Sequence, residues 1–192
     1  MLESYKVILA SNSPRRKELL AGLGISFDVM TIPGIDESFP DSLQGGEIPL
    51  FLAQKKCDAY RDVLKDNTLV ITADTIVWQD GKVLGKPRDR REAIEMLSSL
   101  SGSSHYVYTG VCVRDCHKEI SFYSESKVYF DSLDLSEIEF YVDQFKPFDK
   151  AGSYGIQEWI GYIGVKRIEG SYFNIMGLPI QRLYQELKMF MK

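Results

Sequence analysis

The chain has 192 residues, of which 44% are apolar, and a chain of this size can bury a substantial core as one domain. Its 23 basic and 27 acidic residues give a net charge of -4, which argues against a surface built for nucleic acid or anionic lipid. The start of the sequence lacks the long apolar run of a signal peptide or a membrane span. We therefore expect a cytoplasmic protein without nucleic-acid or membrane partners.

The cysteines and histidines do not form a recognisable metal motif. Cys57, Cys112 and Cys116 are an odd number with no second pair to complete a zinc site, and His105 and His117 are not spaced as a metal pair. The simplest interpretation is reduced thiols in a cytosolic protein.

The first part of the chain alternates short apolar strands with helical patterns. In chain order the predicted elements are a strand over 6–11, a helix over 15–23 ended by Gly24, a strand over 27–31, a polar loop over 32–47, a helix over 49–64 and a strand over 68–78. Asp80 and Gly81 then predict a hairpin turn into Lys82–Leu84, because this dipeptide suits a tight turn.

The second part adds helices around two long alternating segments. The predicted elements are a helix from the cap Asp89 to Leu100, antiparallel strands over 105–114 and 120–132, a helix capped by Ser136 and Glu139 that runs to Phe145, a Gly-rich segment over 151–177 and a final helix over 178–191. No linker or repeat interrupts this order. The fold class predicted is therefore a single α/β domain, 1–192, with a mixed, partly antiparallel sheet flanked by helices.

A polar loop follows the first predicted strand. Ser11, Ser13, Arg15 and Arg16 place two hydroxyls and two guanidinium groups at a helix start. Hydroxyls, helix-terminal amides and guanidinium groups all bind phosphate oxygens, so the loop fits a polyphosphate. The alternative is a turn in which Ser13 caps the helix while Arg15 and Arg16 are solvated.

Further candidates lie on the strand that follows and beside it. Asp74 and Thr75 come near the end of a buried apolar run, where a carboxylate can hold a divalent cation or take a proton from water. Lys86 follows the hairpin and can neutralise charge on a leaving phosphate, although most exposed lysines have no such role. Lys56 lies on the apolar face of its helix, so its side chain is expected to turn toward the sheet. Asp74 has a structural alternative, a carboxylate satisfied by a turn or by a neighbouring base.

The Gly-rich segment carries one side chain suited to base recognition. Gln157 follows Tyr154-Gly155-Ile156, and an amide can donate to and accept from a base at once. The structural alternative is a glycine-permitted bend with Gln157 in a turn. Residues 168–179 are expected to form a loop of mainly architectural function. P-loop, dinucleotide-fingerprint and nucleophile-elbow motifs are absent, which excludes the commonest kinase, dehydrogenase and acyl-transfer machinery.

Together these segments resemble the Maf family of nucleotide pyrophosphatases. The segments that carry the resemblance, between about residues 6 and 182, are ILASNSPRRKELL, Asp36-Glu37, LAQKKCDAY, ITADTIVWQDGKVLGKPRD, LSGSSHYVYTGV, DKAGSYGIQ and IEGSYFNIMGLPI. The resemblance implies an elongated fold similar to inosine triphosphate pyrophosphatases, a divalent cation such as Mg²⁺ or Mn²⁺, and a homodimer. It also implies that water attacks the α-phosphate of a nucleoside triphosphate and that pyrophosphate leaves.

The resemblance assigns roles to particular residues. In the family pattern the aspartate of A-D-T, here Asp74, accepts the proton, and the S-x-S-P-R-R loop holds the phosphates. Arg15, Thr75 and Gln157 match the branch that acts on dTTP and UTP rather than the branch that acts on 7-methyl-GTP. The chain departs from the common pattern at Glu158, where a glycine usually follows the glutamine, and this bears on the shape of the base pocket.

The charges of the substrate lead to the same set of residues. A triphosphate needs several cations, for which Arg15, Arg16, Lys56, Lys86 and a metal ion are available. Glu37 is expected to join Asp74 as a metal ligand, in preference to Asp36, because Mg²⁺ prefers oxygen donors. Two alternatives stay open: a preference for 7-methyl-GTP or a modified pyrimidine triphosphate, and a nucleotide-binding regulator of cell division and septum formation with incidental hydrolysis.

Overall fold

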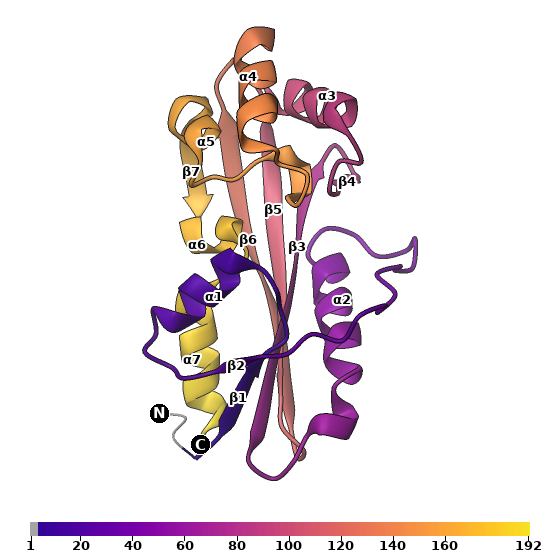
Figure 1. Ribbon diagram of the computed structural model, residues 1–192, viewed down its shortest axis with the longest axis vertical. Coiled ribbons are helices and arrows are strands. Elements are labelled where there is room, and N and C mark those ends of the chain that lie inside the picture. Colours follow the sequence, from indigo (N-terminus) through magenta and orange to yellow (C-terminus); the bar gives the residue numbers. More distant parts are fainter. Residues whose placement is uncertain (1–3) are drawn as a thin grey trace. The chain divides into compact units, whose positions relative to one another are not determined.

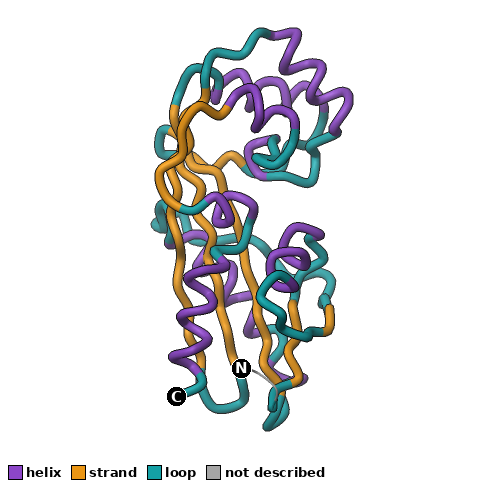
Figure 2. The backbone as a smooth tube through the Cα atoms, turned by 90° about the vertical axis from the view of Figure 1, so that its left-hand side faces the viewer, coloured by secondary structure: helices purple, strands orange, loops and turns teal. Residues whose placement is uncertain are grey.

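The computed structural model describes residues 4–192 and forms a mixed α/β arrangement (Figure 1). Its sheet has seven strands in the order β2-β1-β3-β5-β6-β7, with β4 paired to β3. Figure 2 shows the long strands in orange and the helices that flank them in purple. By its internal contacts the chain divides into two compact units. The strands β3 (Thr68–Gln79), β5 (Ser104–Arg114) and β6 (Glu119–Phe130) contribute residues to both units, so neither unit is a continuous segment.

The first unit comprises Met1–Asp74, Thr109–Ser124 and Gly177–Lys192. Its shorter elements are β1 (Lys6–Leu9), α1 (Pro14–Ala21), β2 (Asp28–Val29), α2 (Glu47–Asp58), the 3-10 helix η1 (Arg61–Val63) and α7 (Ile180–Phe190). β1 pairs in parallel with both β2 and β3. Because α2 ends at Asp58, the predicted helix over 49–64 was too long at its C-terminal end, where η1 forms instead.

The core of the first unit lies between α2 and the strands. Ile8, Val70 and Cys112 from three strands pack with Ala53 and Cys57 from α2, and all are buried. Thr72 Oγ1 donates a hydrogen bond to the Ala53 carbonyl oxygen at 2.6 Å, which satisfies a buried hydroxyl and ties β3 to the helix.

A glycine permits the close approach of α2 to β5. At Gly110 a Cβ atom would lie 2.2 Å from the Pro49 carbonyl oxygen, far inside contact distance. Any side chain at this position would push the helix away from the strand. The position of α2 matters for function, because Lys56 lies in its last turn.

The second unit comprises Thr75–Tyr108 and Glu125–Met176. Its shorter elements are β4 (Lys82–Leu84), α3 (Arg90–Leu100), α4 (Leu135–Phe145), the 3-10 helix η2 (Ala151–Ser153), α5 (Trp159–Gly164), β7 (Val165–Gly170) and α6 (Tyr172–Met176). α3 and α4 lie side by side (Figure 1), and Arg90 Nε donates to Asp143 Oδ1 between them at 2.8 Å. The hairpin into β4 is as predicted, with positive φ angles of 49° at Asp80 and 76° at Gly81.

Of three local predictions in the second unit, one is confirmed and two need correction. Asp89 caps α3 as expected, since its carboxylate accepts the Glu92 N–H at 2.9 Å. The cap of α4 is Asp134 rather than Ser136, with Glu137 accepting the Asp134 N–H at 2.8 Å, so the capping-box spacing was read two residues late. The predicted loop over 168–179 instead contains the end of β7 and the helix α6.

Within the described residues no helix is both long and apolar enough to cross a membrane. All three cysteines are free, and only Cys116 is exposed.

Candidate functional site

The polar loop after β1 is held by its own hydroxyl groups. Ser13 is the N-cap of α1, and its Oγ accepts the Arg16 N–H at 3.4 Å, while Pro14 occupies the first turn. Ser11 is buried, and its Oγ accepts the Ser13 N–H at 3.2 Å. The capping interpretation of Ser13 is thus correct. The same bonds fix the conformation of the loop that was expected to bind phosphates.

The two arginines of the loop are more buried than expected if both were simply solvated. Both are only partly exposed, and Arg16 Nε donates to the Gly177 carbonyl oxygen at 2.8 Å. Burial lowers the pKa of Arg16, the nearby carboxylate of Asp74 opposes that change, and Arg15 adds to it. Guanidinium stays charged under these conditions. The loop therefore presents fixed positive charge in the electrostatic range of Asp74.

A network of ion pairs links α2, β3 and the loop before α2. The Lys56 ammonium lies 2.5 Å from Asp74 Oδ1 and 2.8 Å from Glu37 Oε1. The side chains of Lys56 and Asp74 are 17% and 14% exposed, whereas that of Glu37 is 58% exposed. The side chain of Lys56 thus turns toward the sheet, as its position on α2 predicted. We call Glu37, Lys56 and Asp74 the carboxylate–lysine cluster.

The neighbouring carboxylate of Asp36 belongs to a different group. Its Oδ2 accepts from Lys55 Nζ at 2.7 Å, and its Oδ1 accepts the Ser38 N–H at 2.9 Å. The hydrogen bond from Lys55, followed by those from Ser38, lowers the pKa of Asp36 well below its usual range. Of the two adjacent acids, Glu37 therefore joins Asp74, and Asp36 does not share their lysine.

The carboxylate–lysine cluster fits a divalent cation by the chemistry of its donors. Glu37 and Asp74 supply carboxylate oxygens that converge on one positive charge, the Lys56 ammonium. Oxygen ligands from one or two carboxylates are what Mg²⁺ and similar hard ions take, alongside waters and substrate phosphates. These two residues are the ones that would hold such an ion.

The other predicted binding residues lie in the second unit. Thr75 follows Asp74 in β3 and is half-buried, whereas Lys86 is exposed between Gly85 and Pro87. Gln157 is half-buried, and its Oε1 atom is fully buried without a hydrogen-bond partner among the described residues. A buried acceptor without a partner among the protein groups is suited to a ligand that donates a hydrogen bond.

The loop before Gln157 is fixed by side chains that sequence reasoning missed. Glu158 Oε2 accepts a short hydrogen bond from the Tyr141 hydroxyl, and the Gly155 N–H donates to that hydroxyl oxygen at 3.0 Å. Lys150 Nζ lies 3.1 Å from Glu158 Oε1. A Cβ on Gly155 would lie 2.7 Å from Glu158 Cδ, so only glycine leaves room for the carboxylate. Glu158, the residue at which the chain departs from the common family pattern, thus holds this loop together through its carboxylate.

The aromatic residues of this loop have packing functions. Tyr154 is buried, with its hydroxyl hydrogen-bonded to His105 Nε2 at 2.7 Å and its ring edge-on to Phe130 at a centroid distance of 5.1 Å. Trp159 packs edge-on against Phe140 at 4.9 Å. The general preference of such aromatics for packing accounts for both positions.

Comparisons with known proteins agree with the sequence motifs. The family described as Maf-like protein matches residues 6–190. A protein of Bacteroides thetaiotaomicron named dTTP/UTP pyrophosphatase is 60% identical over 187 residues, covering 97% of each chain. One of the same name from Parabacteroides distasonis is 56% identical over 189 residues, covering 98% of each chain.

A solved structure supports the fold. The structure of a HAM1 protein from Coxiella burnetii superimposes with a TM-score of 0.50 at 12% identity, covering 96% of this chain and 99% of that one. At this identity the likeness concerns the fold alone. The near full-length family match and the high identity to two of its members lead to one conclusion: the chain belongs to the Maf family.

Proposed function

We propose that this chain is a nucleoside triphosphate pyrophosphatase that hydrolyses dTTP and UTP to the monophosphate and pyrophosphate. The observation that carries the proposal is the carboxylate–lysine cluster, in which a nearly buried aspartate lies beside the cationic loop of Arg15 and Arg16. The names of the relatives, which share more than half of their residues with this chain, support the substrate class.

The loop and the lysine would neutralise and orient the triphosphate. Arg15 and Arg16 supply forked donors for phosphate oxygens, and Ser11 and Ser13 add hydroxyls next to the N-terminus of α1. Lys56 supplies a compact charge that the substrate can share with the carboxylates. Fixed charges of this kind lower the energy of the charge that develops during phosphoryl transfer.

Asp74 would serve as the proton acceptor for the attacking water. Its carboxylate accepts the proton as the water oxygen forms a bond to the α-phosphorus, and the bond from that phosphorus to the bridging oxygen of the β-phosphate breaks. The electron pair leaves with pyrophosphate, and the nucleoside monophosphate keeps the new oxygen. A divalent cation held by Glu37 and Asp74 would supply further charge neutralisation to the phosphates when bound.

We assign recognition of the nucleobase to Gln157. Its buried Oε1 atom has no partner among residues 4–192 and can accept the ring N–H that uracil and thymine share. Cytosine lacks a proton at that ring position, which would leave the acceptor unsatisfied. Thr75 and Lys86 stay predictions as further substrate contacts, and so do a homodimer and a cytoplasmic location.

A substrate panel tests the proposal. Pyrophosphate release is measured from dTTP, UTP, CTP, 7-methyl-GTP and the ordinary purine triphosphates, with Mg²⁺ or Mn²⁺ and with a chelator. We expect metal-dependent turnover of dTTP and UTP in preference to the others. A preference for 7-methyl-GTP would overturn the base assignment while leaving the reaction, and binding without turnover would favour the nucleotide-binding regulator.

A further inference from the structure

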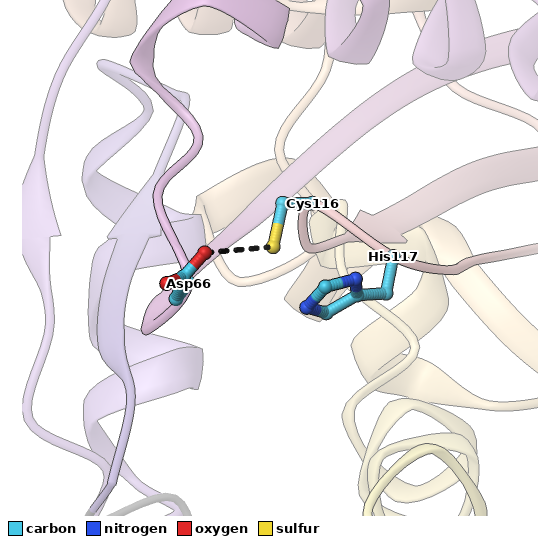
Figure 3. A group of neighbouring side chains, drawn as sticks. All are labelled: Asp66, Cys116 and His117. Carbon is cyan, nitrogen blue, oxygen red and sulfur yellow. Dashed lines mark hydrogen bonds between the residues drawn. The ribbon is translucent and has the colours of Figure 1, made fainter.

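A second group of metal-ligating side chains lies outside the carboxylate–lysine cluster. Asp66, Cys116 and His117 each offer one ligand atom, and these atoms lie within 4.8 Å of one another (Figure 3). Cys116 Sγ donates to Asp66 Oδ1 at 3.9 Å. All three residues are exposed, belong to the first unit and take no part in the proposed hydrolysis.

The fold brings the three residues together from two separate turns. Asp66 lies in the turn that precedes β3, where the Thr68 N–H donates to the Lys65 carbonyl oxygen at 2.8 Å. Cys116 and His117 lie in the turn between β5 and β6. Sequence spacing could not reveal this group, since Asp66 is distant in the chain and the histidine adjoins the cysteine directly.

One buried carboxylate, that of Asp115, fixes the turn that carries Cys116 and His117. Asp115 is 3% exposed, and its Oδ1 accepts the N–H groups of His117 and Lys118 at 2.7 and 2.8 Å. The Tyr5 hydroxyl donates to the other oxygen at 2.9 Å. The thiol and the imidazole are therefore presented on a rigid turn, which lowers the entropy lost when both bind one ion.

The chemistry of the three ligands selects the ion. A thiolate, an imidazole and a carboxylate together suit Zn²⁺ and similar borderline ions, whereas Mg²⁺ and Ca²⁺ take oxygen ligands. Zinc is usually four-coordinate, and three protein ligands leave one position for water. Binding would release the Cys116 thiol proton to solvent as the sulfur–metal bond forms.

We propose that Asp66, Cys116 and His117 form a binding site for Zn²⁺ or a similar thiophilic divalent ion, separate from the proposed catalytic cation. The bound ion links the turn before β3 to the β5–β6 turn. Because it binds the folded chain, it stabilises the folded state by RT ln(1 + c/Kd), where c is the free ion concentration, so the melting temperature rises with the logarithm of c once c exceeds Kd. The proposal does not depend on the proposed function.

Cobalt serves as the probe, because Co²⁺ bound to a thiolate gives a sulfur-to-metal charge-transfer band that carboxylate ligands cannot give. The reduced full-length chain is titrated with Co²⁺, and bound Co²⁺ is then displaced with Zn²⁺. Cys57 and Cys112 are buried, so the band reports Cys116. We expect one thiolate-bound cobalt per chain and loss of the band on addition of zinc.

Three exposed substitutions and one matched control decide the assignment. Cys116→Ser is expected to abolish the band, and His117→Ala and Asp66→Asn to weaken cobalt binding at least about tenfold each, the loss of one ligand. The control Asp62→Asn removes an exposed carboxylate in η1 and leaves the affinity unchanged. Absence of the band in the parent, its persistence in Cys116→Ser, or unchanged affinity in either of the other two variants would overturn the three-residue site.

Discussion

The carboxylate–lysine cluster and the loop around Gln157 differ in how far they depend on charge. The cluster gathers charges: one ammonium is shared between Asp74 and Glu37, and the guanidinium of Arg16 is electrostatically coupled to both carboxylates. Such groups can be rearranged by an anionic substrate or a cation, because each partner exchanges one charge for another. The cluster is therefore suited to chemistry on phosphates.

The loop around Gln157 is held by the ion pair between Lys150 and Glu158 together with buried aromatic and neutral groups. Burial, and then the bond to Glu158, raises the pKa of Tyr141, and burial alone raises that of Tyr154. His105 is 1% exposed, and burial lowers its pKa to about 4. His105, Tyr141 and Tyr154 are therefore neutral at neutral pH, so their packing holds the loop without adding charge. A fixed shape is what recognition of a base requires.

The largest expected effect comes from removing the proton acceptor of the carboxylate–lysine cluster. Asp74→Asn keeps the shape of the side chain but cannot take a proton, so we expect the hydrolysis rate to fall roughly 10²- to 10⁴-fold. Binding of dTTP, measured by calorimetry, should change only a few-fold because the cationic loop remains. A variant that hydrolyses dTTP at the parental rate would remove Asp74 from the reaction.

The neutral state of His105 predicts a pH dependence of stability. Above pH 6.5 the side chain is neutral both folded and unfolded. Between 6.5 and the folded pKa of about 4, the unfolded chain binds a proton that the folded chain does not, so the free energy of unfolding falls as pH falls. The slope is about 1.4 kcal/mol per pH unit, or roughly 3 kcal/mol over the window.

The measurement compares denaturant unfolding of the parent and of His105→Asn between pH 4 and 7. The variant keeps a hydrogen-bonding group but does not titrate, so its stability curve should lack this slope while both proteins share the contribution of the carboxyl groups. Parallel curves would show that His105 is not held neutral.

The unpartnered atom of Gln157 gives a more selective test. Gln157→Leu removes the acceptor at similar volume, and a lost hydrogen bond of about 1–3 kcal/mol corresponds to roughly 10- to 100-fold in kcat/KM. We expect this loss for dTTP and UTP, and a much smaller change for CTP. An equal loss for all three nucleotides would mean that Gln157 supports the loop without reading the base.

The smallest effects distinguish the adjacent acids Asp36 and Glu37. Glu37→Gln should raise the Mg²⁺ or Mn²⁺ concentration needed for half-maximal activity several-fold, since it removes a charged oxygen ligand. Asp36→Asn breaks the exposed ion pair with Lys55 and weakens the hydrogen bonds from Ser38, none of which involves Lys56 or Asp74, so it should leave that concentration unchanged. Should the two variants behave alike, the separation of Asp36 from the cluster is wrong.

Local sequence signals predicted most of the secondary structure. The turn at Asp80-Gly81 and the cap at Asp89 were found because each depends on side chains only a few residues apart. The helix α6 and the C-terminal end of α2 were not, because short or terminal helical turns depend on packing that propensity does not record.

The candidate residues could be named from the sequence, whereas their contacts could not. Lys56 and Asp74 stood out by position, and Glu37 was preferred to Asp36 as the acid that joins Asp74, but the ion pairs of the two acids with different lysines were not predicted. Glu158 was visible only as a departure from the family pattern. Its partners Tyr141 and Lys150 come from other segments, so only the fold reveals why a carboxylate at this position is useful.

The position of the oxygen delivered by water distinguishes attack on the α-phosphorus from attack on the β- or γ-phosphorus. Hydrolysis of dTTP is carried out in ¹⁸O-labelled water, and the products are analysed by mass spectrometry. If Asp74 directs water to the α-phosphorus, one labelled oxygen appears in dTMP and none in pyrophosphate. Label in pyrophosphate, or release of inorganic phosphate with labelled oxygen, would place the attack on another phosphorus and rule out attack at the α-phosphorus.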